Sequence, residues 1–205
     1  MVEFTIENLS SEQVERLRDV YGPLTDSVRE LIDATIRTEV DPAAVAAAKA
    51  EIDTATARLR SRQLDGAFGV RISEAHQMPW GNPVIGLRNP SAPPLVMQRT
   101  ADGVVYADFQ LGAAFEGPPG HVHGGIAALV LDHVLGEAAS SLEHPRLTGT
   151  ISLRYLRTTP LGPVHAEARI VRTEGVKTFA VGHLADADGV TVEAEGVFIT
   201  PKWAR

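Results

Sequence analysis

The chain contains no cysteine, and that absence removes three kinds of chemistry. Without thiols the protein has no disulfide, no thiolate-liganded zinc site and no cysteine nucleophile. The sequence also lacks the G-x-S-x-G elbow of serine hydrolases, the P-loop and the G-x-G-x-x-G dinucleotide fingerprint. Serine-hydrolase and nucleotide-hydrolase activities are therefore disfavoured.

Basic clusters and long apolar runs are missing as well. Lysine and arginine total 19 against 26 aspartates and glutamates, for a formal net charge of -7. Nucleic-acid binding needs a basic surface, so we expect no nucleic-acid partner. No apolar run has membrane-spanning length, and the N-terminal residues MVEFTIENLS lack the pattern of a signal peptide. We expect a cytoplasmic protein with no membrane partner.

The first third of the chain has helical character. Residues 10–63 favour helices, with breaks expected at Gly22-Pro23 and at Asp41-Pro42. Asp41 is a good N-cap and Pro42 suits a first helical turn. We expect residues 1–64 to form an N-terminal helical arm, which either packs simply or serves as a lid or an oligomer contact.

Residues 65–205 predict a second unit of α+β class. Residues 65–94 are rich in proline and glycine, and we expect them to form a connector that packs against the rest of the protein. Trp80 is expected either to pack in a core or to line a pocket wall. A hairpin is expected over residues 95–111, and apolar and polar residues alternate over 148–157, 164–172, 178–185 and 190–199. One helix between these groups predicts an antiparallel sheet wrapped around a central helix.

The central helix is expected over residues 124–142, the longest apolar run, which predicts burial around its whole circumference. It follows the proline and glycine residues of FEGPPGHVHGG. The first N–H groups of a helix have no partner and carry partial positive charge. Because Gly124 and Gly125 have no side chains to cover these groups, a carbonyl oxygen or an anion could approach them closely.

Asp132 is an acid among apolar neighbours in this helix. An unpaired buried carboxylate costs several kcal/mol, so it needs either a function or an ordinary partner. At helical spacing it shares a row with small residues, namely Gly125, Ala128, Gly136 and Ala139. Such a row would let a substrate or a neighbouring backbone lie against the helix.

The string FEGPPGHVHGGIAALVLDHVLG resembles the active-site segment of the hot-dog-fold acyl-CoA thioesterases of the PaaI-like group. In that group E/Y-G-P-P-G, H-G-G and an acid nine residues beyond the histidine occur together. The stretch N-P-x-A-P-P-L at residues 89–95 is similar too. The resemblance implies a hot-dog thioesterase domain over residues 65–205, connector included, with acyl-CoA as substrate.

For thioester hydrolysis, the amides of Gly124 and Gly125 would polarise the carbonyl and stabilise the oxyanion. Asp132 would activate water, or attack directly to give a mixed anhydride that water opens. The resemblance implies that His123 orients the carbonyl or the first turn; a histidine here could also simply cap the helix. Thr148 stands where related enzymes carry a hydroxyl that positions the water or the acid, unless it only begins a strand.

Three further residues are candidates for substrate binding. Tyr155-Leu156-Arg157 resembles the family's Tyr-x-Arg-Pro segment, whose arginine lies near the CoA phosphates, but Thr158 replaces the proline here. Gly136, in the row of small residues, is expected to lie against the substrate. His121 and His123 form an H-x-H pair without an apparent third ligand, so we expect no metal and no cofactor other than the CoA of the substrate.

The spacing within the helix also predicts an assembly. Asp132 lies about two turns, or roughly 10 Å, from Gly125, so one helix cannot bring both to the same carbonyl. The resemblance implies that each site combines the amides of one subunit with the acid of another, in a homodimer or a dimer of dimers. Two alternatives are a non-catalytic acyl-CoA-binding hot-dog protein and a hot-dog enoyl-CoA hydratase; the presence of Asp132 favours hydrolysis.

Overall fold

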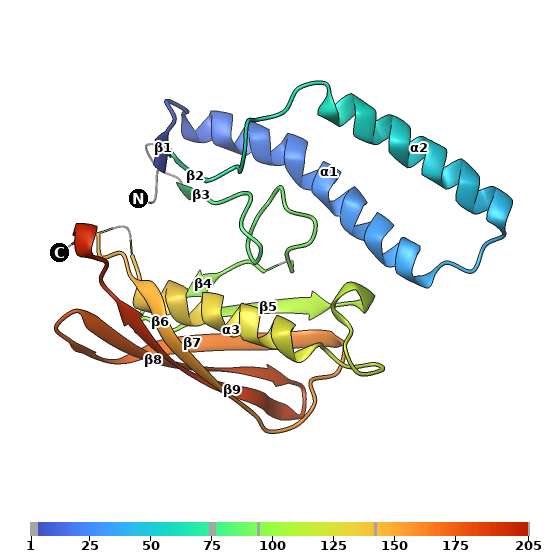
Figure 1. The fold of residues 1–205 in the computed structure, drawn as a ribbon. Coiled ribbons are helices and arrows are strands. Elements are labelled where there is room, and N and C mark those ends of the chain that lie inside the picture. The colour runs from blue at the N-terminus through green and yellow to red at the C-terminus, as the bar shows by residue number, and fades with distance from the viewer. Residues whose placement is uncertain (1–3, 74–76, 94, 142, 205) are drawn as a thin grey trace. The chain divides into compact units, whose positions relative to one another are not determined.

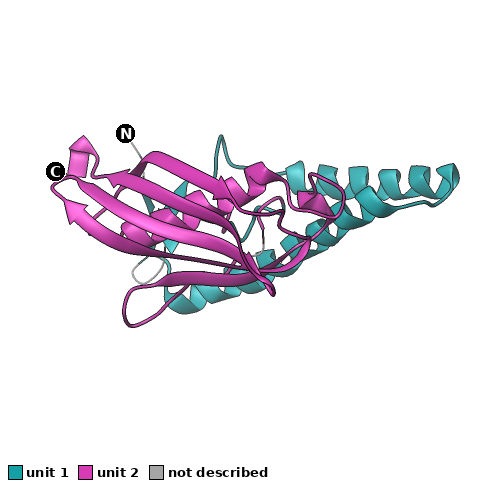
Figure 2. Ribbon diagram, turned by 90° about the horizontal axis from the view of Figure 1, so that it is seen from below, with its two compact units in different colours: residues 1–82, 86–90 teal, residues 83–85, 91–205 magenta. Residues whose placement is uncertain are grey.

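The structure is a computed structural model that describes residues 4–73, 77–93, 95–141 and 143–204, and it divides into two compact units (Figure 2). Unit 1 consists of Met1–Asn82 and Gly86–Pro90, and unit 2 of Pro83–Ile85 and Ser91–Arg205. This division differs from the boundary expected after residue 64. Much of the connector belongs to unit 1, because its apolar side chains share a cluster with Val14; they are Phe68, Met78, Trp80 and Leu87.

Unit 1 contains two helices and a small sheet (Figure 1). The helices are α1 (Ser11–Arg37) and α2 (Pro42–Arg60). The strands β1 (Phe4–Ile6), β2 (Val70–Ile72) and β3 (Gln77–Met78) lie in the order β1-β2-β3, with β1 parallel to β2 and β3 antiparallel to it. The sequence did not predict this sheet, because strands of two or three residues are too short to show a period-2 pattern.

The break expected at Asp41-Pro42 is confirmed, since the Asp41 carboxylate accepts the Ala44 N–H at 2.9 Å and Pro42 begins α2. The break expected at Gly22-Pro23 is wrong, since α1 continues through Pro23. Proline removes one backbone hydrogen bond from a helix, but α1 is stabilised by contacts of residues before and after Pro23. Tyr21 packs against the Val14 cluster, and Arg29 Nη2 donates to the Asn89 carbonyl at 3.3 Å.

Among the described residues, unit 2 is a six-stranded antiparallel sheet with one long helix along one face (Figure 1). The strands are β4 (Gln98–Arg99), β5 (Val105–Leu111), β6 (Leu147–Tyr155), β7 (Gly162–Glu174), β8 (Lys177–Asp186) and β9 (Gly189–Ile199). Their order is β4-β5-β7-β8-β9-β6, and α3 (Gly124–Ala139) connects β5 to the edge strand β6. Two short 3-10 helices, η1 (Ala113–Phe115) and η2 (Lys202–Ala204), complete the unit. The arrangement is the hot-dog fold and confirms the α+β prediction.

The core of unit 2 lies between α3 and the sheet. The helix buries seven residues: Ala127, Val130, Leu131, Val134, Leu135, Ala138 and Ala139. They pack against alternate residues of the strands, including Ala166, Leu184, Val192 and Phe198. Burial around the whole circumference is therefore a wrong expectation, because the sheet covers one face and leaves Gly125 and Glu137 exposed. The helix ends at Ala139; Leu142, its expected last residue, lies outside the described residues.

Within the described ranges, no helix combines the length and the apolar character needed to cross a membrane.

Candidate active site at the start and middle of α3

The loop before α3 is a closed turn. The Gly117 N–H donates to the His121 carbonyl at 2.9 Å, and the His121 N–H donates to the Pro118 carbonyl at 2.8 Å. Gly120 has a φ of 73°, which favours glycine, and its N–H donates to Glu116 Oε1 at 2.6 Å. The prolines and glycines of the motif therefore shape a rigid approach to the helix. Sequence reasoning gave Glu116 no role, although an acid four residues before a glycine in a tight turn is suited to this contact.

Two backbone contacts fix the point at which the helix begins. The Val122 N–H donates to the Thr159 carbonyl at 2.8 Å, and the His123 N–H donates to the Phe115 carbonyl at 2.9 Å. Gly117 passes so close that a Cβ there would lie 2.7 Å from the Cα of His123. A side chain at position 117 would therefore displace the residue that precedes α3.

His123 is the N-cap of α3, which agrees with the expectation that this histidine could simply cap the helix. Its Nδ1 accepts the Gly125 N–H at 3.0 Å, which requires a neutral ring with its proton on Nε2. The Ile126 and Ala127 N–H groups donate to the His123 carbonyl at 2.9 and 3.3 Å. Among the described residues, the Gly124 N–H finds no hydrogen-bond acceptor. Two glycine N–H groups were expected to bind a carbonyl. The Gly125 N–H is already bonded to His123, so among the described residues only the Gly124 N–H is free to do so.

Tyr155 holds the first turn from the far end of β6. Its hydroxyl donates to the Gly124 carbonyl at 2.8 Å, and a Cβ on Gly124 would lie 3.5 Å from its ring. The Tyr155 side chain is nevertheless exposed. The structure places Tyr155 against Gly124, and its expected role in substrate binding stays a prediction.

Asp132 and Thr148 meet at the opposite end of the same region. The Thr148 hydroxyl donates to Asp132 Oδ1 at 2.9 Å, and the carboxylate is half-buried. Thr148 precedes an irregularity in the pairing of β6 with β9, where Gly149 is extra; bulges of this kind redirect side chains and are frequent beside active sites. In the described part of the chain Asp132 makes no other hydrogen bond, so Oδ2 remains available.

The row of small residues around Asp132 lies mainly on the side of α3 that the sheet leaves uncovered. Gly125 is exposed, Ala128 and Gly136 are half-buried, and Ala139 is buried. A Cβ added to Gly136 would meet only Phe198 Cε1, at an ordinary contact distance of 3.5 Å. Packing within the chain therefore does not require glycine at 136, and its expected contact with a substrate stays a prediction.

The structure pairs Arg157 with Asp186, and its expected contact with CoA phosphates stays a prediction. Its Nη1 donates to Asp186 Oδ2 at 2.7 Å, and its Nη2 donates to Asp186 Oδ1 and to the Gly189 carbonyl. The Arg157 hydrogen bond, opposed by desolvation, lowers the pKa of the nearly buried Asp186 carboxyl to about 2. The guanidinium therefore ties the end of β6 to the β8–β9 turn. The Thr158 that replaces the family's proline follows this arginine directly.

His121 and His133 complete the neighbourhood. His121 Nδ1 bonds to the Pro119 carbonyl at 2.8 Å, while His123 Nδ1 accepts the Gly125 N–H. His133 Nε2 is buried without a hydrogen-bond partner in the structure. Burial lowers the pKa of His133, against the opposite effects of Glu137 and Asp132. His133 is therefore neutral at pH 7 and adds no positive charge beside Asp132.

Known proteins share sequence and fold with this chain. The Thioesterase superfamily model matches residues 119–193, which include the Gly124 turn, Asp132 and Thr148. The crystal structure of a thioesterase superfamily protein superposes with a TM-score of 0.77 at 32% sequence identity, over 95% of this chain and 98% of that one. A central helix carrying an acid, set on a hot-dog sheet, defines a class of thioester-handling proteins. The chain belongs to the thioesterase superfamily.

Two relatives are named enzymes. The chain is 33% identical over 94 residues to acyl-coenzyme A thioesterase THEM4 of Xenopus laevis and 28% identical over 94 residues to acyl-coenzyme A thioesterase THEM5 of Homo sapiens. Each match covers 44% of this chain, but only 42% of the first relative and 38% of the second. The similarity therefore spans less than half the length of either enzyme.

Proposed function

We propose that the protein hydrolyses acyl-CoA thioesters to a carboxylic acid and free CoA. The observation that carries this proposal is the half-buried Asp132 carboxylate, which a hydroxyl from β6 holds by one oxygen while the other is available. The names of the two relatives support acyl-CoA as the substrate class. The reaction as proposed needs only water and the thioester.

The free Gly124 N–H at the positive end of α3 would receive the thioester oxygen. In the tetrahedral intermediate this oxygen becomes negative, and a single donor to such an oxyanion typically contributes about a hundredfold or more to the rate. His123 keeps the turn in place through Gly125, and its Nε2–H is available as a second donor. These groups hold the carbonyl while the CoA sulfur departs as a thiolate.

Asp132 would take a proton from water as the water attacks the carbonyl carbon, with Thr148 holding the carboxylate in orientation. Direct attack by Asp132 is the second form of the proposal and would give a mixed anhydride that water opens. Label in the Asp132 carboxylate after a single turnover in oxygen-18 water would establish the anhydride, opened by water at the Asp132 carbonyl carbon. Because opening at the acyl carbon labels only the product acid, trapping of the acyl group by hydroxylamine is the second test for an anhydride.

The proposed site is completed by a second copy of the chain. Strand β6 is at the edge of the sheet and most of its residues are exposed, which leaves one side of its backbone open for pairing. Thr148 and Asp132 lie near the start of β6, and Tyr155 and Gly124 lie near its end. Antiparallel pairing of two β6 strands would bring the start of one beside the end of the other. The acid of one subunit would then face the free amide of its partner.

The test is thiol release from a panel of short, long and aromatic acyl-CoA esters. We expect hydrolysis of at least one ester with saturation kinetics. Binding of the esters without release of thiol would favour the non-catalytic alternative, and loss of an enoyl group without release of thiol would favour the hydratase.

A further inference from the structure

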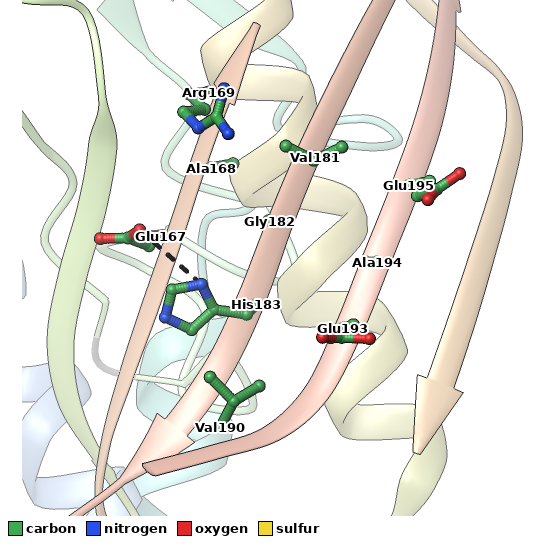
Figure 3. A pocket seen from close by; sticks show the side chains of 10 residues that line it. All are labelled: Glu167, Ala168, Arg169, Val181, Gly182, His183, Val190, Glu193, Ala194 and Glu195. Carbon is green, nitrogen blue, oxygen red and sulfur yellow. Dashed lines mark ion pairs between the residues drawn. The ribbon is translucent and has the colours of Figure 1, made fainter. Parts of the chain in front are cut away.

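The sheet of unit 2 carries a cluster of metal-binding side chains on the face turned away from α3. His165 and Glu167 belong to β7, and His183 belongs to β8 directly opposite Glu167 in the antiparallel register. Strand alternation explains their direction, since Ala166 and Ala168 between and beside them are buried under α3. Figure 3 shows Glu167 and His183 pointing toward each other, with the helix behind the strands.

The spacing of these groups is that of ligands around an ion. His165 Nε2 lies 3.5 Å from Glu167 Oε2, and His183 Nδ1 lies 3.7 Å from Glu167 Oε1. Neither contact meets the criteria of a good hydrogen bond. One ligand atom from each residue lies within 4.8 Å of the others. Two ligands bound tetrahedrally at about 2.0–2.2 Å from zinc are about 3.3–3.6 Å apart, so small side-chain shifts would close a three-ligand site.

The Asp108 carboxylate orients the His165 ring for metal binding. Asp108 Oδ1, from β5, lies 2.8 Å from His165 Nδ1, which places the proton of the neutral ring on Nδ1. The lone pair of Nε2 then faces Glu167. Metal-bound histidines commonly donate their second ring N–H to a carboxylate in this way. The Tyr106 ring stacks on His165 with centroids 6.0 Å apart and restricts it further.

The surroundings favour a cation with an open coordination position. Glu167 and His183 line a pocket of about 380 Å³ that also includes Glu193, Glu195 and Arg169 (Figure 3). Acids outnumber bases around this pocket. The side chains of His165, Glu167 and His183 are 34%, 39% and 28% exposed, so an ion and a bound water could reach them from solvent.

We propose that His165, Glu167 and His183 bind a divalent transition-metal ion of the zinc type, with water in the fourth position. Two imidazoles and one carboxylate suit zinc, and the affinity of such sites for calcium or magnesium is low. The ion would join β7 to β8 on the face of the sheet opposite Asp132. It would act independently of thioester hydrolysis.

The test uses the full-length chain, freed of any affinity tag and treated with chelator, in a calorimetric titration with Zn²⁺. We expect one ion per chain. His183→Gln and Glu167→Gln should each weaken binding by about tenfold or more, whereas His144→Gln, which changes an exposed histidine outside the cluster, should bind as the wild type does. No saturable binding by the wild type, or unchanged binding by His183→Gln, would overturn the proposal.

Two further readouts separate a built site from chance coordination. Asp108→Ala should reduce the affinity for Zn²⁺ roughly 10- to 100-fold at unchanged stoichiometry, because it removes the acceptor behind His165. Excess Zn²⁺ should raise the Tm of the wild type but not of His183→Gln, and equal Tm values for both in chelator show that the variant is folded. Thioester hydrolysis should be the same with and without chelator. An equal increase in Tm for both proteins would contradict metal binding at this cluster.

Discussion

At the scale of single residues, the N-terminal turn of α3 shows how one side chain determines which backbone group is free. The sequence treats Gly124 and Gly125 alike, since both lack a side chain and both follow the motif. Only the orientation of the His123 ring, which accepts from Gly125, separates them. A rotamer is set by local packing in three dimensions, so the choice of the oxyanion donor could not be predicted from the sequence.

Thr148 offers a test of how the acid is oriented. Thr148→Val keeps the shape of the side chain and removes the donor to Asp132, so we expect kcat to fall by about tenfold with KM nearly unchanged. Steady-state thiol release measures both parameters, and Thr148→Ser, which keeps the hydroxyl, is the matched control. Equal losses in the valine and serine variants would mean that the methyl group matters and the hydrogen bond does not.

Arg157 and Asp186 make a prediction about pH. The folded-state pKa of Asp186, about 2, lies below the unfolded value near 3.9, so the pair stabilises the fold above about pH 4 and the stabilisation is lost as pH falls toward 2. Arg157→Gln should lower the Tm at pH 7 by roughly 2–4 °C, and this difference should shrink between about pH 4 and 2. Thermal melts across that range provide the measurement. If Arg157→Gln instead leaves the Tm unchanged and raises the KM for acyl-CoA, the main role of Arg157 would be to bind the CoA phosphates.

At the scale of elements, strong periodicity made most of unit 2 predictable. The strands β6 to β9 lie within a few residues of the expected ranges, because apolar and polar residues alternate along the sequence of each. The helix α3 begins where Gly124 was expected to start it. In unit 1, β1 pairs with β2 between residues more than 60 positions apart, such as Phe4 with Val70, and strands of two or three residues leave no local signal.

Helix α1 is the element in which local propensity failed, and it provides a stability test. Pro23 lies inside the helix, where proline usually costs roughly 3 kcal/mol relative to alanine. Pro23→Ala should therefore stabilise unit 1 by about 1–3 kcal/mol, reduced by the greater freedom of the unfolded chain. Hydrogen exchange of the α1 amides would detect the gain as slower exchange. Faster exchange would show that the proline is needed for the local geometry of the helix.

At the scale of the whole molecule, the sequence predicted the fold of unit 2 but not the division into units. The connector joins unit 1 through scattered contacts of Trp80 and its neighbours, which have no period to detect. The pairing of Asp132 with Thr148, expected from the family resemblance, is present. Asp132 and the Gly124 N–H lie too far apart along α3 to act on the same carbonyl within one subunit. The proposed mechanism therefore requires the proposed dimer.

Subunit mixing tests that dimer. Gly124→Pro removes the first-turn N–H that has no acceptor among the described residues. The helix should tolerate this change, because proline is favoured at the first helical position and His123 already has the extended conformation that precedes proline. Gly124→Pro and Asp132→Asn should each be nearly inactive alone. Denatured together and refolded, they should recover about a quarter of wild-type activity, since about half of the dimers are mixed and each mixed dimer has one intact site. Recovery of no activity, with mixed dimers demonstrated by mass, would place the acid and the amide in the same subunit.

The most direct measurement of the central claim is the kcat of Asp132→Asn on the best acyl-CoA ester. Asparagine keeps the volume of the side chain and can still accept from Thr148, so the Tm and the mass in light scattering should match the wild type. Because the amide cannot take a proton from water or form the anhydride, we predict a fall in kcat of at least about a hundredfold. A correctly folded Asp132→Asn variant that releases CoA at near the wild-type rate would contradict the account.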